Sequence, residues 1–521
     1  MKISNKILFF SIFTLLFACN PTKNTLQESS QKETDDDLIE FQFFHINDVY
    51  EIAPLENGKV GGMARVATVF KKLKAKNANT FFVHAGDFAN PSLLGTLKYQ
   101  GKRIRGKQMV EVMNACGVDV VTFGNHEFDI KEKELQERLN ESTFEWLGTN
   151  VLHQTDGLLE PFYKMRNGKK EYVHENLILD LKDTDGTTIK IGLFGPTIDS
   201  NPQDWVHYED YYEQSVNSYL ELVCQTDLVL GLTHLEIGQD KKLASLLPNV
   251  PLFMGGHDHH HSLDTVGNVV IAKADANAKT AYLHKMTYNE GTKELTLESE
   301  LIYINDKIEA EPTVKAIVDK WTKIQETEIL QVIEKPYEVI YQAKEPLDAR
   351  EHVIRNQQTN FGQAIAAAMT GAAKKTADCA ILNSGTIRID DQLEGDVFAI
   401  DMFRAMPFGG DIKEVEMKGS ALKKTLDIGL INKGTGGYLQ WDNIAYNEMD
   451  KSWKIGGQPL DLAKTYRVMT TYYLMTGKET RLDFLKEGNP DIISIDNPIK
   501  DDKNDVRSDI RRVAIAYFKT L

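Results

Sequence analysis

The sequence contains little cysteine and has no excess of positive charge. Only four of its 521 residues are cysteine, and Cys116, Cys224 and Cys379 lie far apart, so we expect buried thiols without a disulfide framework. The 76 acidic residues outnumber the 60 basic ones, which gives a formal charge of -16. This balance excludes a nucleic-acid polymer as partner, because binding one needs surplus positive charge to neutralise phosphates.

Long apolar runs are also absent beyond the N-terminus, where residues 7–17 form one that is too short to span a bilayer. Two lysines precede this run, as is typical of a signal peptide. The run ends in Leu-Phe-Ala-Cys at Cys19, which resembles a bacterial lipobox, whereas an ordinary signal peptide with an incidental cysteine is the alternative. We therefore expect a lipoprotein signal peptide over 1–19 and a polar, flexible tether over 20–37. The exported chain would be held by lipid alone, on the periplasmic or cell-surface side.

The length and the 42% apolar content favour two domains with separate cores. Over residues 38–305, short apolar runs alternate with helical patterns, which predicts an α/β layered domain. A polar helical stretch over 306–334 follows, which we interpret as the connection between domains. The remaining residues, 335–521, mix helical and strand-like pieces and predict a second, smaller α/β domain.

Polar side chains follow the predicted strands of the first domain. The apolar runs that predict buried strands are residues 40–46, 80–84, 118–123, 189–194, 228–233 and 252–254. Helical patterns occupy residues 62–74 and 106–116, and Gly117 is a helix stop. The polar residues that come shortly after strands are Asp48, Asp87, Asn125, His234 and His257. Open α/β sheets collect ligands at the carboxyl ends of their strands, so we expect these side chains to converge.

Five short motifs carry these residues: HINDVY at 45–50, GD at 86–87, GNHEFD at 124–129, TH at 233–234 and GGHDH at 255–259. Mixed carboxylate and imidazole donors suit Mn, Fe or Zn more than Ca. Asp87 would bridge two ions roughly 3.5 to 4 Å apart, which orients the ester and makes a bound water acidic enough to attack phosphorus. His126 would face the attacked phosphate, and Asp129 would orient its ring and keep it protonated.

The ordered motifs resemble the calcineurin-like metallophosphoesterase superfamily, and GNHEFD with the distant C-terminal half is similar to the 5'-nucleotidase family. This resemblance implies a four-layer α/β/β/α catalytic domain, a smaller α/β substrate-binding domain and two divalent metal ions, Mn, Zn or Fe. It implies one ion held by Asp48, Asp87 and His259. It implies a second ion held by Asp87, Asn125, His234 and His257.

The first motif departs from the family pattern. Members usually have Asp-x-His, where this chain has Asp48-Val49-Tyr50, so the first ion loses an imidazole ligand. Tyr50 could coordinate Fe(III) or Mn as phenolate, or it could line the pocket while water completes the shell. We favour the second, since an unperturbed phenol ionises near pH 10. His259, where some members carry Gln, keeps the donor function.

The C-terminal half resembles the family's substrate-binding domain in the order of Arg355, TNFG at 359–362, NSGTIR at 383–388 and PFGG at 407–410. The resemblance implies that two arginines clamp phosphate or ribose with their forked donors and that two aromatic rings stack on the base. The implied substrate residues are Arg355, Asn383, Arg388, Phe408, Tyr473 and Glu479. The loop over 471–480 departs from the family's Asn-Asp-Phe and Gly-Gly-Asp-Gly, so Glu479 would stand in for a ribose-binding Asp.

The sequence therefore predicts an exported, metal-dependent phosphoric ester hydrolase. The expected reaction converts nucleoside 5'-monophosphates to nucleoside and phosphate by attack of metal-bound hydroxide, with domain rotation carrying the substrate, as the resemblance implies. Alternatives within the family are a UDP-sugar, cyclic-nucleotide or other phosphate-ester hydrolase. A non-catalytic surface binding lipoprotein is an alternative of another class, which the presence of His126 and Asp129 disfavours.

Overall fold

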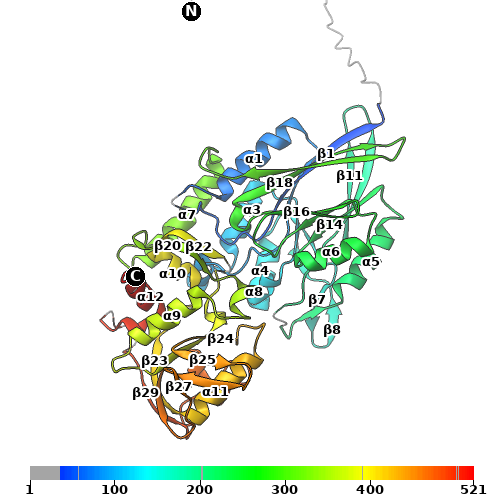
Figure 1. The fold of residues 1–521 in the computed structure, drawn as a ribbon. Helices are drawn as coiled ribbons and strands as arrows, with labels where there is room; N and C mark the ends of the chain where they lie inside the picture. The colour runs from blue at the N-terminus through cyan, green and yellow to red at the C-terminus, as the bar shows by residue number, and fades with distance from the viewer. Residues whose placement is uncertain are drawn as a thin grey trace, which may run out of the picture.

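The computed structural model describes residues 36–521 apart from positions 57, 201–202, 332, 390, 500–501 and 503. The expected signal peptide, Cys19 and tether residues 20–35 lie outside the described residues. None of the helices in the described part of the chain has the length and apolar character needed to cross a membrane. Figure 1 shows an upper body coloured from blue to green and a lower body coloured from yellow-green to red.

The upper body contains two six-stranded sheets. The first has the order β19 (Leu295–Tyr303), β18 (Thr280–Asn289), β1 (Leu38–Ile46), β2 (Thr80–His84), β5 (Val120–Thr122) and β6 (Glu145–Leu147). The second has the order β11 (Asn176–Lys182), β12 (Thr188–Phe194), β14 (Leu228–Thr233), β15 (Leu252–Gly255), β17 (Val269–Lys273) and β16 (Ser262–Val266). The central strands of each sheet are parallel, so their carboxyl ends share one edge.

The two sheets pack face to face and carry helices on their outer faces. Phe43 and Val83 of the first sheet share a core with Leu193 and Leu230 of the second. Helices α1 (Met63–Lys76), α3 (Lys107–Cys116) and α7 (Pro312–Ile329) cover the first sheet, and α5 (Tyr211–Leu222) and α6 (Ile237–Leu246) cover the second. This arrangement is the four-layer α/β/β/α sandwich expected from the sequence.

The remaining elements of the upper body are short and lie in its connections. They are α2 (Leu93–Thr96), β3 (Lys98–Tyr99), β4 (Lys102–Arg103), η1 (Asn125–Asp129), α4 (Glu132–Glu141), β7 (Val151–Thr155), β8 (Leu158–Glu160), β9 (Tyr163–Arg166), β10 (Lys169–Tyr172), β13 (Val206–Tyr208) and η2 (Ala276–Ala278). Of these, η1 begins at a predicted metal ligand.

Several predicted elements are confirmed with little change in their bounds. Strands β2 and β14 begin and end where the apolar runs do, and all six residues of β14 are buried, as expected for a parallel strand covered on both faces. Gly117 adopts φ 78° and caps the C-terminus of α3, which confirms the helix stop. The predicted strand at 118–123 is shorter in the structure, since only Val120–Thr122 pairs with its neighbours.

Helix α7 lies where the sequence indicates the connection between domains. Pro312 opens it in the first turn, where a missing N–H is tolerated, and Glu311 caps it by accepting from the Val314 N–H at 2.7 Å. Its Trp321 is fully buried and donates from Nε1 to Glu111 of α3 at 2.9 Å. The connecting helix is therefore packed onto the first sheet's helical layer rather than free.

The lower body contains a five-stranded sheet of order β24 (Leu439–Asp442), β21 (Cys379–Asn383), β28 (Thr465–Thr471), β23 (Ile412–Lys418) and β29 (Ile492–Asp496). Helices α9 (Asn360–Gly371) and α12 (Ile510–Phe518) pack on one face, and α11 (Gly419–Ile431) packs on the other. A paired strand unit, β20 (Val339–Asp348) with β22 (Gln392–Phe398), lies beside α10 (Ala399–Ala405). This is the smaller α/β domain expected from the sequence.

The other elements of the lower body are α8 (Glu351–Ile354), η3 (Ser384–Thr386), β25 (Ile444–Asn447), β26 (Ser452–Ile455), β27 (Gln458–Pro459), η4 (Leu474–Thr476) and η5 (Val506–Ser508). Helix α9 ends at Gly371. Beyond it the Lys374 N–H donates to Glu414 of β23 at 2.9 Å, which turns the chain toward the sheet.

One expectation about the cysteines is wrong. Cys116 and Cys379 are buried and free, and burial raises the pKa of both thiols. Cys224 is exposed. It lies two residues after Leu222, which is buried in α5, so at about 100° per residue it points away from the packed face.

Candidate metal centre and substrate site

The predicted ligands lie at the shared carboxyl-end edge of the two sheets. From the first sheet, Asp48 follows β1, Asp87 follows β2, and Asn125 opens η1 after β5. From the second sheet, His234 follows β14 and His257 follows β15. The structure thus brings both halves of the sandwich to one site, at the place where parallel sheets bind ligands.

Glycines in the motifs allow the ligand loops to approach one another. A Cβ on Gly124 would lie 2.1 Å from Asp87 Oδ1 and 2.5 Å from the Asp87 backbone nitrogen. A Cβ on Gly86 would lie 2.8 Å from His234 Nδ1, and one on Gly256 would lie 2.3 Å from a backbone carbonyl oxygen. Any larger residue would push the loops apart, which explains the glycines that precede Asp87, Asn125 and His257.

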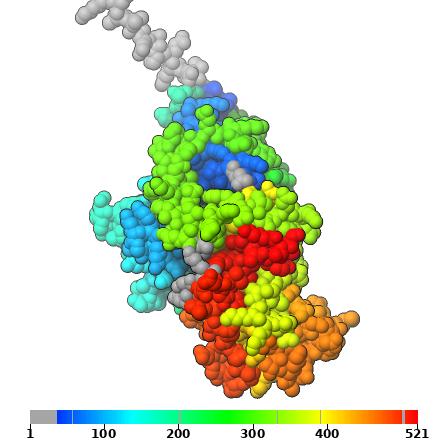
Figure 2. Space-filling view, turned by 90° about the vertical axis from the view of Figure 1, so that its left-hand side faces the viewer, coloured from blue at the N-terminus to red at the C-terminus, as the bar shows by residue number. Residues whose placement is uncertain are grey.

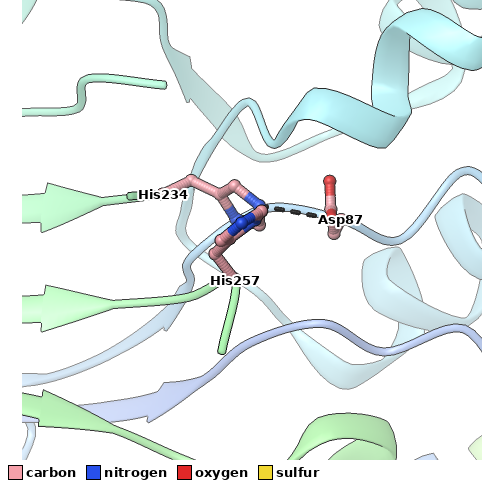
Figure 3. A group of neighbouring side chains, drawn as sticks. All are labelled: Asp87, His234 and His257. Atoms are coloured by element: carbon pink, nitrogen blue, oxygen red, sulfur yellow. Dashed lines mark ion pairs between the residues drawn. The ribbon is translucent and has the colours of Figure 1, made fainter. Parts of the chain in front are cut away.

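Asp87 is at the middle of the cluster and is fully buried. Its Oδ2 lies 3.2 Å from His234 Nε2, and its Oδ1 accepts from the His126 backbone N–H at 2.8 Å. Ligand atoms of Asp87, His234 and His257 all lie within 4.8 Å of one another. Figure 3 shows the three side chains converging from separate strand ends.

The imidazoles are arranged to present ring nitrogens to this space. His234 Nδ1 donates to the Ala85 carbonyl oxygen at 2.7 Å, which leaves Nε2 facing Asp87 and 3.1 Å from Asn125 Oδ1. Burial lowers the pKa of His257 to about 4, with His234 adding to the effect. Burial also opposes protonation of His234, but the Asp87 charge outweighs it and raises that pKa to about 9.

Asp48, His259 and Tyr50 form the adjacent part of the cluster. Asp48 is fully buried and accepts from the Asn47 side chain at 2.7 Å and from the His257 N–H at 2.9 Å. Its Oδ1 lies 3.3 Å from His259 Nε2. The Tyr50 hydroxyl donates to Asp87 Oδ2 at 3.1 Å and lies 3.1 Å from His259 Nε2. Tyr50 thus occupies a position between two predicted ligands.

This donor set fits divalent metal ions. Two fully buried carboxylates, Asp48 and Asp87, lie beside imidazole nitrogens and a side-chain amide oxygen. Buried carboxylates need compensating positive charge, and mixed oxygen and nitrogen donors are those that Mn, Fe and Zn accept. The geometry agrees with the chemistry that the sequence motifs indicate.

The predicted catalytic pair, His126 and Asp129, adjoins the predicted ligands. His126 is buried, and its Nδ1 donates to Asp129 Oδ2 at 2.8 Å, while its Nε2 lies 3.9 Å from Asp87 Oδ2. Burial lowers the pKa of His126, but the charges of Asp87 and Asp129 outweigh it and raise the pKa to about 9. The imidazolium is therefore available beside the cluster at neutral pH.

Glu127 is a residue of this site that the sequence analysis did not assign. It is fully buried and accepts backbone N–H bonds from Asp87 at 2.9 Å, Phe88 at 2.8 Å and Gly124 at 2.7 Å. One carboxylate therefore holds the GD loop against the GNHEFD turn. Its position inside the motif, three residues after Gly124, was the signal available in the sequence.

Residues 41–261 match the family described as calcineurin-like phosphoesterase, and residues 339–487 match the family described as 5'-nucleotidase, C-terminal domain. The chain belongs to the 5'-nucleotidase family. The two matched segments correspond to the two bodies of the structure, and membership identifies the protein as a hydrolase of phosphoric esters that uses divalent metal ions.

Relatives of this family cover most of the chain. The trifunctional nucleotide phosphoesterase protein YfkN of Bacillus subtilis is 26% identical over 80% of this chain, which spans only 30% of that protein's length. The 5'-nucleotidase of Bos taurus is 24% identical, with 84% of this chain and 83% of that one aligned. The structure of a 5'-nucleotidase precursor from Thermus thermophilus superposes with a TM-score of 0.67 at 21% identity, covering 92% of this chain and 96% of that one, which shows a shared fold.

In this 5'-nucleotidase-family chain, the C-terminal domain places Arg388 against the catalytic domain. A guanidinium nitrogen of Arg388 contacts Asp129 Oδ2, and another lies 3.8 Å from Glu351. Burial would raise the pKa of Asp129, but the Arg388 charge outweighs it and holds that pKa well below its usual range. Arg388 thus reaches the space beside His126.

Glu351 is a second residue that sequence reasoning missed. It opens α8, forms an ion pair with Arg355 one helical turn later, and lies 3.9 Å from His126 Nε2. Its Glu-x-x-x-Arg spacing was the signal in the sequence. Arg355 is itself buried, with 7% of its surface exposed.

The other predicted substrate residues form two pairs. Asn383 Nδ2 donates to Glu479 Oε2 at 3.2 Å, which brings the NSGTIR motif to the altered loop. Phe408 is 53% exposed and Tyr473 is 44% exposed. Phe408 comes four residues before β23 and Tyr473 two residues after β28, at the end of this strand pair where Ile412 is opposite Thr471. Exposed aromatic rings at neighbouring strand ends are suited to stacking rather than to a core.

A cavity of about 540 Å³ separates the two domains beside the metal cluster. From the catalytic domain it is lined by Tyr50 and Pro91, from the connecting helix α7 by Thr322, and from the C-terminal domain by Arg388 and Leu393. Figure 2 looks onto this face, where blue N-terminal residues are visible between green and yellow-green segments. The cluster therefore borders on interdomain space rather than on a packed core.

Charged pairs cross the interface around this cavity. Lys279 Nζ lies 2.7 Å from Asp391, and Arg404 Nε lies 4.0 Å from Glu51. Each pair joins one residue of the catalytic domain to one of the C-terminal domain. Together with the contact between Arg388 and Asp129, they fix the relative position of the domains in this conformation.

Proposed function

We propose that the protein is an exported phosphoesterase that uses two divalent ions to hydrolyse nucleoside 5'-monophosphates to nucleoside and phosphate. The observation that carries the proposal is the convergence of carboxylate, amide and imidazole donors at one sheet edge, opposite an arginine of the second domain. In this assignment residues 38–305 hold the metals, 306–334 connect the domains, and 335–521 bind the nucleoside.

The ligands divide into two sets that share Asp87. One ion would be held by Asp48, Asp87 and His259, and the other by Asp87, Asn125, His234 and His257. Two such ions supply concentrated positive charge and a water acidic enough to attack phosphorus. Mn, Zn and Fe are the candidates, because their ligand preferences include both donor types.

Tyr50 lines the first of these positions in our assignment rather than coordinating as phenolate. Its hydroxyl already donates to Asp87 Oδ2 at 3.1 Å, which requires the protonated form. In that role the hydroxyl restrains the Asp87 carboxylate, which both ligand sets need in one orientation.

The chain's own residues then handle charge and protons. His126, kept protonated by Asp87 and Asp129, is placed to donate from Nε2 to the leaving oxygen or to a phosphoryl oxygen, because Nδ1 is engaged with Asp129. Arg388 lies within the same space and offers forked N–H donors to phosphoryl oxygens. Both groups stabilise negative charge that develops as the ester bond breaks.

The C-terminal domain would hold the nucleoside. Phe408 and Tyr473 offer ring faces for base stacking, a contact worth about 1–3 kcal/mol per base and tolerant of base identity. Asn383 and Glu479, already hydrogen-bonded to each other, present an amide and a carboxylate to sugar hydroxyls. Domain rotation, as the family resemblance implies, would carry the bound substrate to the metals.

The expected membrane attachment rests on Cys19 alone. Cys19→Ser is expected to move the protein from the membrane fraction to the soluble exported fraction and to abolish incorporation of a labelled fatty acid. Unchanged membrane retention in the variant would show that the cysteine is incidental.

Release of phosphate from a panel of nucleoside monophosphates, cyclic nucleotides, nucleotide sugars and an aryl phosphate tests the function. We expect AMP-type substrates to be preferred, chelation to abolish turnover, and added Mn or Zn to restore it. Asp87→Asn should be inactive, whereas Asp180→Asn, at an exposed position on β11, should match the wild type. Turnover that survives chelation would overturn the metal mechanism. A preference for another class of ester would overturn the proposed substrate assignment.

A further inference from the structure

A fully buried lysine lies beneath the loops that carry the histidine ligands. Lys273 is the last residue of β17 and has no exposed surface. Its Nζ lies 2.9 Å from Asp240 Oδ2 and 2.5 Å from Asp258 Oδ2. A buried ammonium is destabilising unless it is paired and hydrogen-bonded, so this arrangement needs an explanation. The two carboxylates hold the pKa of Lys273 above its usual value despite burial.

The remaining contacts of this ammonium are to the ligand loops themselves. Lys273 Nζ donates to the Leu235 carbonyl at 2.5 Å and to the Gly256 carbonyl at 2.7 Å. Leu235 directly follows His234, and Gly256 directly precedes His257. The ammonium therefore joins the loop after β14 to the loop after β15, each one residue from a histidine of the cluster.

The loop after β15 needs such support. His257 and His259 adopt φ 82° and 59°, the left-handed region that is unfavourable for residues with a side chain. Asp258, between them, accepts from Lys273. Strained backbone persists only where surrounding contacts hold it in place, and Lys273 contacts this loop through both a main-chain carbonyl and a side chain.

We infer that Lys273 is a positioning residue of the metal centre, which holds the His234 loop and the His257–His259 loop at the spacing in which their imidazoles meet Asp87. The inference rests on the metal-dependent function proposed above. All of the contacts described for the Lys273 ammonium are to groups inside the protein, so its three N–H donors have no role at the surface. Residues behind metal ligands of this kind typically contribute about 10- to 100-fold to metal affinity.

The test measures metal affinity directly. Lys273→Met keeps the volume but leaves the buried Asp240 carboxylate and the half-buried Asp258 carboxylate without their cation, so Asp240→Asn is added to remove the buried charge. Mn and Zn dissociation constants are obtained by chelator competition for the wild type and for both variants. We expect affinity to fall by about 10- to 100-fold in each variant, and kcat to recover toward the wild-type value at saturating Mn.

Lys164→Met is the matched control. Lys164 is also a buried lysine, which donates to the Phe144 carbonyl at 2.6 Å and lies 3.4 Å from Glu145. Its contacts lie away from the metal loops, so the variant should lose thermal stability without a change in metal affinity. If metal binding weakened in both the Lys273 variant and the Lys164 variant, the loss would be a general effect of deleting a buried lysine and would contradict the inference.

Wild-type metal affinity in the folded Lys273→Met, Asp240→Asn protein would overturn the inference. If that protein does not fold, Asp258→Ala decides, because it removes the Asp258 acceptor and keeps the lysine paired with Asp240. We expect the metal affinity of this single variant to fall by an intermediate amount. An unchanged metal affinity would also overturn the inference. A wild-type protein that binds neither Mn nor Zn would instead overturn the proposed function itself.

Discussion

Gly124→Ala is expected to damage the metal centre while leaving the fold intact. Gly124 adopts φ −100° and ψ 177°, an extended conformation open to any residue, so alanine introduces no backbone strain. The added Cβ would lie 2.1 Å from Asp87 Oδ1 and 2.5 Å from the Asp87 nitrogen. Both the carboxylate and the GD loop must therefore move away from the GNHEFD turn.

The magnitude follows from that displacement. The carboxylate must shift by at least 1.3 Å, from 2.1 Å to the 3.4 Å at which ordinary van der Waals contact begins, and a misplacement of only about 1 Å can reduce an enzymatic rate by ~100-fold. This factor corresponds to about 2.7 kcal/mol of transition-state stabilisation. Because Asp87 belongs to both proposed ligand sets, we expect weaker metal binding together with the loss of kcat.

The assay is hydrolysis of an aryl phosphate with Mn or Zn present, alongside thermal unfolding and chelator competition. Gly238→Ala serves as control, since Gly238 lies in α6 and a Cβ there meets nothing within 4 Å. That substitution should leave activity unchanged and slightly raise stability. Wild-type kcat/KM and metal affinity in Gly124→Ala would refute the central position given to Asp87.

Three further outcomes follow from the same geometry. Phe408→Ala should raise KM for AMP by about 5- to 150-fold, the equivalent of one lost stacking contact of about 1–3 kcal/mol, while aryl phosphate kinetics stay unchanged; an equal effect on both substrates would contradict the stacking role. Asp129→Asn should lower kcat by ~100-fold or more, as measured by steady-state kinetics. A normal kcat in this variant would show that Asp129 takes no part in proton transfer. Among the described thiols, a disulfide reagent should label Cys224 and spare Cys116, as peptide mapping by mass spectrometry would show; rapid labelling of Cys116 would contradict its burial.

The sequence predicted the catalytic domain well because its signals are local. Buried parallel strands such as β2 and β14 are continuous apolar runs, and polar residues after such strands must meet at one edge. Gly117 likewise indicated the C-terminal end of helix α3. These features need only a few neighbouring residues to be recognised.

Features that depend on distant contacts could not be predicted in this way. Asp129 meets Arg388 across 259 positions of sequence, and no local pattern indicates that pair. Lys273 likewise carries no sequence signal, and the Glu-x-x-x-Arg spacing of Glu351 indicates only its pairing with Arg355, not its position beside His126. Cys224 was assigned to the interior by its residue type, whereas its position after α5 decides its exposure.

The origin of the ligands in both six-stranded sheets has a consequence for the folding of the catalytic domain. Ions held between Asp87 of one sheet and His234 of the other would join the two sheets of the sandwich. Binding to the native state alone adds RT ln(1 + [L]/Kd) to its stability, so this edge would be the first to open when metal is scarce. For a protein that works outside the cytoplasm, as proposed here, the metal supply of its surroundings would then set its lifetime as well as its catalytic rate.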